Sequence, residues 1–148
     1  MEHHIERLDV QRTAVVRARV AVDRIPAFLA GAYAEVLAVL AAQGLGACGP
    51  PFARYGMGDR TFDVEAGLPT TAPVVPSGRV EASQLPGGPA LVIMHRGAYD
   101  DVALDLRAGQ EWLAANRWIA TGDPWEAFLD GPEVAEPRTV VYVPCRPA

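Results

Sequence analysis

Two stretches of the sequence repeat the same pattern of residue types. Residues 40–55 read LAAQGLGACGPPFARY and residues 113–128 read LAANRWIATGDPWEAF, and the two align without a gap. Each gives the end of a helix, a loop containing glycine, a proline, and then a strand of the form aromatic-x-x-aromatic. The repetition indicates two copies of one supersecondary unit.

The strands on either side of these stretches repeat as well. Runs rich in β-branched residues stand in the same order in both copies, which is typical of strands. The predicted strands are residues 13–20, 52–55 and 61–66 in the first copy, and residues 90–95, 125–128 and 139–143 in the second.

A helix is predicted between the first two strands of each copy. Apolar residues recur at helical spacing over residues 25–40, before a stop at Gly44, and over a shorter run at residues 102–116. Asp23 and Asp100 precede the two helices, and we expect each to act as an N-cap. The buried positions predicted between the helices and the sheet are Phe28, Val36, Leu40 and Leu113.

The predicted fold class is α+β, with duplicated β-α-β-β repeats, pseudo-twofold symmetry, an antiparallel sheet and two long helices. We expect a single domain over residues 1–148, with repeat one at about 1–69 and repeat two at about 77–148. The proline-rich connection, about 70–76, belongs to a run from Gly67 to Pro76 that we expect to be extended and on the surface.

The composition favours a globular protein that does not bind nucleic acid through its overall charge. Of the 148 residues, 50% are hydrophobic and 21% are charged, and the net charge is −5. Every basic residue except histidine is arginine, and we expect the early arginines to lie on a solvated face. We see no apolar run of about 18 residues and no signal peptide, so we predict a cytoplasmic protein. The early arginines are Arg12, Arg17, Arg19 and Arg24.

The sequence offers no clear metal, cofactor or nucleophile motif. Cys48 and Cys145 have no CxxC spacing, and we expect both to be reduced and structural. We also interpret His95, on a predicted strand, as a structural histidine whose hydrogen bonds are satisfied. The predicted metal ligands and cofactors are therefore none.

Glu126 is the residue most indicative of a binding site. On a strand, Glu126 and Phe128 point to one face, and Trp125, Ala127 and Leu129 to the other. Its repeat partner is Ala53, so the duplicated scaffold does not require a carboxylate there. A charge among aromatic residues needs compensation, either by a bound cation or by an arginine such as Arg54. A structural ion pair and a solvent-facing edge remain the alternatives.

The aromatic residues favour a flat or lipophilic ligand, because aromatic rings stack on planar groups and attract cations. Tyr55, on the strand face equivalent to Phe128, and Tyr99, just before the second helix, are the strongest candidates. We interpret Asp63 and Glu65 as a solvated face. The predicted ligand-binding residues are Glu126, Tyr55, Tyr99, Trp125, Phe128, Tyr33, Trp112 and Tyr142.

Three stretches resemble the GyrI-like family, which also occurs as the effector-binding domain of bacterial drug-responsive regulators. They are residues 62–69 (FDVEAGLP), 97–100 (GAYD) and 124–129 (PWEAFL), and the resemblance covers nearly the whole chain. It implies a cleft between the repeats for bulky lipophilic, often cationic, compounds, with Glu126 as the acidic contact. The family commonly has tyrosine where this chain has Phe128.

Three functions follow from these observations. The first is a small-molecule-binding protein for drug sequestration or effector sensing, which contacts neither nucleic acid nor membrane directly and whose partner regulator is unknown. The alternative is a hydrolase of strained electrophilic natural products, with Glu126 as the catalytic carboxylate. The third is a protein-interaction role such as gyrase modulation, for which we find no acidic run.

Overall fold

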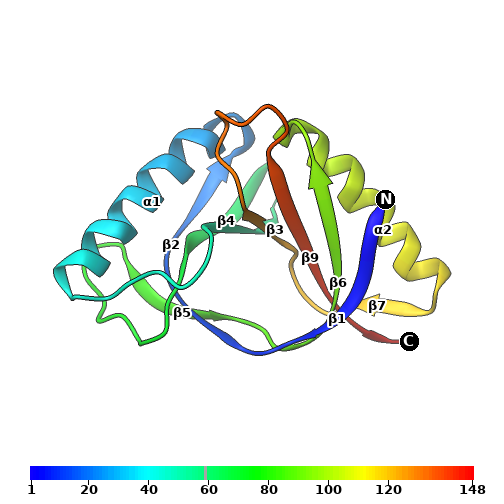
Figure 1. Cartoon of the computed structure of the whole chain (residues 1–148), viewed down its shortest axis with the longest axis horizontal. Helices are drawn as coiled ribbons and strands as arrows, with labels where there is room; N and C mark the ends of the chain where they lie inside the picture. The colour runs from blue at the N-terminus through cyan, green and yellow to red at the C-terminus, as the bar shows by residue number, and fades with distance from the viewer. Residues whose placement is uncertain (59) are drawn as a thin grey trace. The chain divides into compact units, whose positions relative to one another are not determined.

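The computed structural model describes residues 1–58 and 60–148, residue 100 by its backbone only. The chain forms two compact units, Val10–Leu85 and a second that joins Met1–Asp9 to Pro86–Ala148. Each unit contains one long helix and an antiparallel sheet (Figure 1). The fold is therefore α+β, as the sequence predicts.

The first unit, here the α1 unit, is organised around strand β4. Strands β2 and β3 pair antiparallel with the two sides of β4, and β5 extends the sheet beyond β2. Its elements are β2 (Gln11–Ala21), the short 3-10 helix η1 (Val22–Arg24), α1 (Ile25–Ala42), β3 (Phe52–Met57), β4 (Thr61–Pro69) and β5 (Glu81–Leu85).

The second unit, here the α2 unit, is organised in the same way around β9. Strands β6 and β8 pair with the two sides of β9, β1 extends the sheet beyond β6, and β7 pairs with the end of β9. Its elements are β1 (Glu2–Leu8), β6 (Gly88–Arg96), the 3-10 helix η2 (Tyr99–Asp101), α2 (Val102–Ala115), β7 (Trp118–Ala120), β8 (Trp125–Phe128) and β9 (Arg138–Pro147).

The strand register confirms the duplication. The order β5-β2-β4-β3 in one unit corresponds to β1-β6-β9-β8 in the other. Ala53 of β3 lies opposite Ala66, and Glu126 of β8 lies opposite Val141, so the two aromatic-x-x-aromatic segments occupy equivalent strands.

The units nevertheless differ from the predicted repeats at their outer strands. Residues 2–8 lead into β2 but pair with β6, and residues 81–85 lead into β6 but pair with β2. Strand β1 therefore belongs to the sheet of the α2 unit, although the α1 unit comes next in the chain. Strand β5 belongs to the sheet of the α1 unit, although the α2 unit comes next. The assignment of the whole chain to a single domain stays a prediction.

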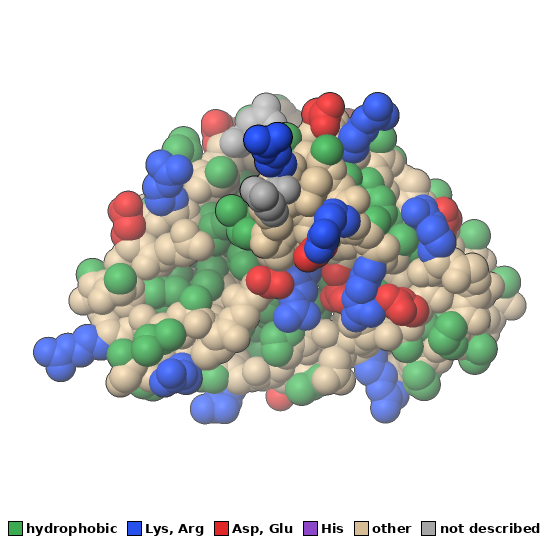
Figure 2. Space-filling view, turned by 180° about the vertical axis from the view of Figure 1, so that it is seen from behind, with side chains coloured by type: hydrophobic (Ala, Val, Ile, Leu, Met, Phe, Trp, Pro, Cys, Tyr) green, Lys and Arg blue, Asp and Glu red, His purple; other side chains and the backbone are tan. Residues whose placement is uncertain are grey.

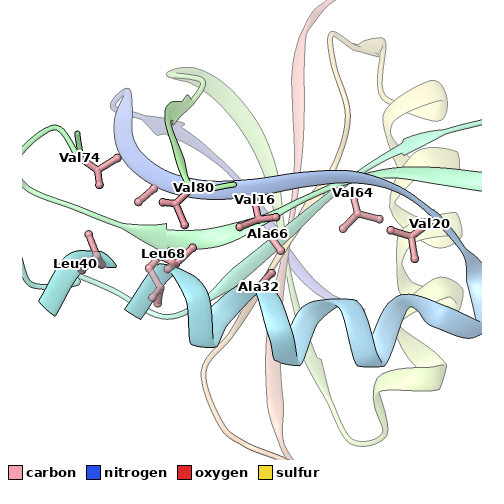
Figure 3. Packing of buried hydrophobic residues seen from close by; sticks show 11 residues of the cluster. Val16, Val20, Ala32, Leu40, Val64, Ala66, Leu68, Val74 and Val80 are labelled. Carbon is pink, nitrogen blue, oxygen red and sulfur yellow. The ribbon is translucent and has the colours of Figure 1, made fainter. Parts of the chain in front are cut away.

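The core of the α1 unit lies between α1 and one face of its sheet. Side chains of β2 and β4 point toward the helix in Figure 3, where Val16 and Ala66 lie opposite Ala32. Val36 and Leu40 are fully buried, and Leu113 is buried in the core of the α2 unit, as predicted. Phe28 is only half-buried, because it lies in the first turn of α1, at the margin of this core.

The proline-rich run does not lie entirely on the surface. Strand β4 continues through Gly67 to Pro69, and the side chain of Val74 is buried in the core. A Cβ on Gly67 would collide with the carbonyl oxygen of Ala14 on β2, so only glycine allows this close approach of the two strands. Composition alone predicted a loop, whereas strand pairing continues up to the proline.

The ends of α1 only partly follow the prediction. Asp23 lies inside η1, and the N-cap is Arg24, which makes no capping hydrogen bond through its side chain. The predicted cap at Asp100 lies outside the described side chains. At the other end Gly44 has φ 68°, and Leu45 donates its N–H to the Leu40 carbonyl at 2.9 Å, which confirms the glycine stop.

The helical segment Val22–Ala42, 21 residues long, has the length and apolar composition of a membrane span. No uninterrupted apolar run of about 18 residues is present in the sequence here, because Gly31 and Glu35 lie within this segment. A helix that packs on the sheet of a globular unit meets the same criteria, and α1 buries Ala32, Val36 and Leu40 in this way.

We expect Leu40→Ala to lower the free energy of unfolding by about 2–5 kcal/mol, because Leu40 is 2% exposed and its removal leaves a cavity. Urea denaturation measures this loss. Leu37→Ala is the matched control, since Leu37 lies on the same helix and is 52% exposed. A loss below about 1 kcal/mol for Leu40→Ala would contradict the described packing of α1.

Candidate functional site

Strand β8 directs Glu126 and Phe128 to the face of its sheet that α2 covers. Residues directly opposite each other on paired strands share a face. Glu126 lies opposite Val141, which packs in the core beneath α2, and Phe128 lies opposite Thr139. Both side chains are half-buried, whereas Trp125 and Ala127 are buried on the other face. The strand alternation predicted for these four residues is confirmed.

Tyr99 joins Phe128 on this face. It lies in η2, between β6 and α2, and its ring meets the Phe128 ring edge-on, with centroids 5.6 Å apart. Its hydroxyl donates a hydrogen bond to the backbone oxygen of Asp130 at 2.7 Å. Burial, and then the negative charges of Glu133 and Asp130, raise the pKa of Tyr99. The carboxylate and two aromatic residues predicted for the site thus share one face of the α2 unit.

Trp125 and Tyr142 lie together on the opposite face. They are cross-strand neighbours, and their rings stack with centroids 5.2 Å apart and an angle of 14° between planes. Burial, and then the negative charge of Glu6, raise the pKa of Tyr142. Neither ring lines the face that carries Glu126.

Trp112 lies elsewhere in the same unit. It projects from α2 and packs against the core of the unit, as does Ile5 of the outer strand β1. Its ring meets the ring of His3 edge-on, with centroids 5.1 Å apart. Because β1 lies beyond β6, at the opposite edge of the sheet from β8, Trp112 is separated from Glu126 by the width of the sheet.

Tyr33 and Tyr55 belong to the α1 unit. Tyr55 lies opposite Val64, on the face that α1 covers, and its ring contacts Phe62 edge-on at 6.3 Å between centroids. Tyr33, on α1, donates a hydrogen bond from its hydroxyl to the Phe52 carbonyl at 2.9 Å. The two tyrosines therefore share the helix side of their own unit.

An ion-pair network covers the other face of the α1 unit. Arg17 binds Glu65 at 2.7 Å and Glu81 at 2.6 Å, and Arg54 lies 3.9 Å from Glu65. Burial of Arg17 opposes its charge, but the hydrogen bonds and charges of the two glutamates outweigh it and raise its pKa. Glu65 is only 8% exposed, so its assignment to a solvated face is wrong, whereas Asp63 is exposed as predicted.

The four early arginines are exposed, as predicted. Two of them, Arg17 and Arg19, are engaged with carboxylates on neighbouring strands. In the space-filling view of Figure 2, arginine and acidic side chains are interspersed on the face shown, and no large zone of one sign stands apart. Such a surface gives little of the uniform positive potential that attracts phosphate backbones.

His95 is a buried histidine with both ring nitrogens engaged, as the sequence analysis expected. Nδ1 lies 2.6 Å from a carboxylate oxygen of Asp105 on α2, and Nε2 lies 2.8 Å from the backbone oxygen of Ala98. Burial opposes the charge of His95, but these hydrogen bonds and the negative charges of Asp105 and Asp101 outweigh it and raise its pKa. Sequence reasoning missed Asp105, although it stands on the buried stripe of α2, three residues after Val102.

The cysteines give no sign of a reactive site. Cys48 is exposed and Cys145 is buried, and burial raises the pKa of the Cys145 thiol. Within residues 1–58 and 60–148, no group of three or more histidine, cysteine or acidic residues is placed to hold a metal ion.

Comparison with known proteins identifies the family. The family described as "GyrI-like small molecule binding domain" matches residues 1–146. No curated protein matches the chain closely enough to count as a relative.

Solved structures share the fold at low sequence identity. The C-terminal domain of EcmrR has a TM-score of 0.87 at 18% identity, covering 99% of this chain and 98% of that domain. EcmrR in a DNA complex has a TM-score of 0.86 at 19% identity, where 99% of this chain spans 58% of the EcmrR chain. SAV2435 bound to tetraphenylphosphonium has a TM-score of 0.69 at 13% identity, covering 99% of this chain and 94% of that one.

We expect the stability of the protein to depend on the protonation of His95. Because its pKa is raised on folding, the stabilisation is complete below the unfolded value of about 6.5 and is lost as pH rises through the folded pKa. Asp105→Asn removes the charged partner of His95. The loss of unfolding free energy caused by this substitution should therefore become smaller as pH rises from about 6 to about 9. Urea denaturation across this range measures it, with the exposed His4→Gln as control. A cost for Asp105→Asn that is constant with pH would contradict this linkage.

Proposed function

The chain belongs to the GyrI-like family of small-molecule-binding domains, and we propose that its ligands are lipophilic aromatic cations held by Glu126. The domain would act in drug sequestration or in effector sensing. Glu126 supplies the negative charge, and Phe128 and Tyr99 supply aromatic surface on the same face of the α2 unit.

The position of Glu126 is the observation that carries this proposal. Glu126 is half-buried on the same strand face as Phe128, so its negative charge lies beside an aromatic ring, and both can attract a lipophilic cation. The equivalent residue of the other unit is Ala53, which is fully buried, so the fold itself does not need a charge at this point.

The aromatic rings add selectivity for cations that carry flat aromatic substituents. A cation over an aromatic face gains about 0.5–2 kcal/mol, and flat substituents stack on the rings with little loss of side-chain freedom. Tyr33 and Tyr55, on the helix side of the α1 unit, remain predicted ligand-binding residues. We leave out Trp125 and Tyr142, which stack on the opposite face, and Trp112, which packs beside β1.

One neighbour of similar fold supports the ligand class. SAV2435 is bound to tetraphenylphosphonium, a lipophilic cation with four phenyl rings. The same chemistry suits a carboxylate beside Phe128 and Tyr99. Extending this ligand class to the present chain is part of our proposal, since 13% identity establishes the fold alone.

We also propose that the domain senses or sequesters its ligand in the cytoplasm without contacting DNA itself. The net charge of −5 and the pairing of Arg17 and Arg19 with carboxylates disfavour a phosphate-binding surface. EcmrR, found in a complex with DNA, is a longer chain, of which this domain spans 58%.

A matched pair of triphenyl compounds tests the role of Glu126. Methyltriphenylphosphonium carries a positive charge, and triphenylphosphine oxide has nearly the same shape without it. Glu126→Gln keeps the side-chain shape and removes the charge, so the cation should lose about tenfold to a hundredfold in affinity. The neutral oxide should bind the variant and the wild type almost equally.

Isothermal titration calorimetry measures the affinity of each protein variant for both compounds. Glu111→Gln serves as the control, because Glu111 is an exposed glutamate on α2. Equal losses for the cation and the oxide would assign Glu126 a packing role. No loss for either would place the ligand away from Glu126 and contradict the proposal.

A further inference from the structure

Three polar side chains form a cluster between α2 and its sheet, on the same sheet face as Glu126 and Phe128. His95 on β6 is 6% exposed and Thr139 on β9 is 0% exposed, and the two lie directly opposite each other. Asp105 reaches His95 from α2. Among the described residues, the Thr139 hydroxyl has no hydrogen-bond partner. Thr139 also lies opposite Phe128, so the cluster is continuous with the candidate site.

The α1 unit has only apolar residues at the equivalent positions. Ala18 lies opposite Val64 on β2 and β4, as His95 lies opposite Thr139 on β6 and β9. The gap-free alignment of the two helix ends makes Ala32 the equivalent of Asp105. Ala32 and Val64 belong to the buried core of the α1 unit. The fold therefore does not require polar groups here, and burying them has a cost that calls for a functional reason.

The cluster contacts the turn that carries Tyr99. The Nε2 atom of His95 lies 2.8 Å from the backbone oxygen of Ala98, the residue just before Tyr99. Gly97 begins this turn with φ 113°, a conformation that favours glycine, and donates its N–H to the Pro137 carbonyl at 3.0 Å. His95 thus links the end of β6, the helix α2 and the Tyr99 turn.

We propose that His95 and Asp105 form a positioning pair that holds the Tyr99 ring against Phe128 and thereby sets ligand affinity at the Glu126 face. This inference rests on the proposed function for its ligand. Tyr99 is the residue that touches ligand, and His95 acts through the backbone at Ala98. The pair is present only in the unit that also carries the additional carboxylate, Glu126.

The protonation of His95 determines whether the pair is complete. Both neighbours of its ring, the Asp105 carboxylate and the Ala98 carbonyl, are hydrogen-bond acceptors. Only the doubly protonated imidazolium donates to both, because the neutral ring has a single N–H. On deprotonation, the Ala98 carbonyl or the Asp105 carboxylate loses its hydrogen bond, and the Tyr99 turn is less firmly held.

The surroundings of His95 favour its charged form. Asp105 faces it from α2, Asp101 acts on it from η2, and its cross-strand neighbour on β9 is the uncharged Thr139. Burial disfavours the charge, but the hydrogen bonds and acidic neighbours prevail and raise the pKa of His95. Affinity should therefore fall as pH rises through the raised pKa of His95.

A double-mutant cycle with methyltriphenylphosphonium separates positioning from general stability. His95→Gln should weaken binding by about threefold to tenfold in the wild-type background, because one aromatic contact is lost. In a Tyr99→Ala background the same substitution should have no further effect on affinity, although its thermal destabilisation should persist. The exposed His4→Gln is the control and should leave affinity unchanged.

Two further measurements keep the inference testable if His95→Gln folds poorly. The wild-type affinity, measured from about pH 6 to about pH 9, should fall at alkaline pH, and Asp105→Asn should flatten this profile. Equal effects of His95→Gln with and without Tyr99, or a wild-type affinity that does not change with pH, would overturn the inference.

A readout without ligand distinguishes failure of this inference from failure of the proposed function. In the NMR spectrum of the unliganded protein, the ring current of Phe128 should shift the Tyr99 ring signals. This shift should diminish in His95→Gln and as the wild type is titrated to alkaline pH. If the wild type does not bind the phosphonium, the proposed function fails, and the Tyr99 signals still decide the positioning role. Signals unchanged by His95→Gln would overturn that role.

Discussion

The candidate site depends on the register between β8 and β9. Side chains alternate along a strand, so a shift of one residue would exchange the two faces of β8. The observed pairing of Glu126 with Val141 places the carboxylate on the helix side, and the pairing of Trp125 with Tyr142 places their stack on the other. The buried Trp125 stabilises this register, because a shift of one residue would move its large side chain to the other face and lose the free energy gained by burying it.

Comparison of equivalent positions in the two units distinguishes residues that the shared fold requires from residues present in one unit alone. Strand order and register agree between the units, so equivalent positions are directly comparable. Where the α1 unit has Ala53, Ala18 and Val64, the α2 unit has Glu126, His95 and Thr139. These polar additions lie on one face and converge near Tyr99 and Phe128. A binding role for that face accounts for additions that packing does not require.

Local pattern predicted most of the elements. The gap-free repeat identified β3 and β8 as equivalent, and helical spacing identified α1 and α2. The outer strands β1 and β5 were missed, because they are polar edge strands whose pairing partners are distant in the sequence. The same distant pairing makes the units differ from the predicted repeat bounds. Glu65 was misjudged because its ion pair with Arg17 depends on the neighbouring strand, not on its own alternation.

The structure brings only some of the predicted site residues onto one face, for a related reason. Alternation along β8 correctly grouped Glu126 with Phe128, but aromatic content alone also included Trp112, Trp125 and Tyr142. Which face a ring occupies depends on its cross-strand partner and on the helix above it, and neither follows from composition. Asp105 carried the clearest missed signal, since an acidic residue on a buried helical stripe requires a partner.

The most direct test of the account is a crystal structure of the protein with methyltriphenylphosphonium. The account predicts that the phosphonium centre lies beside the Glu126 carboxylate and that phenyl groups contact Phe128 and Tyr99 on the α2 side of the sheet. A ligand bound instead against Trp125 and Tyr142, or away from β8, would contradict it.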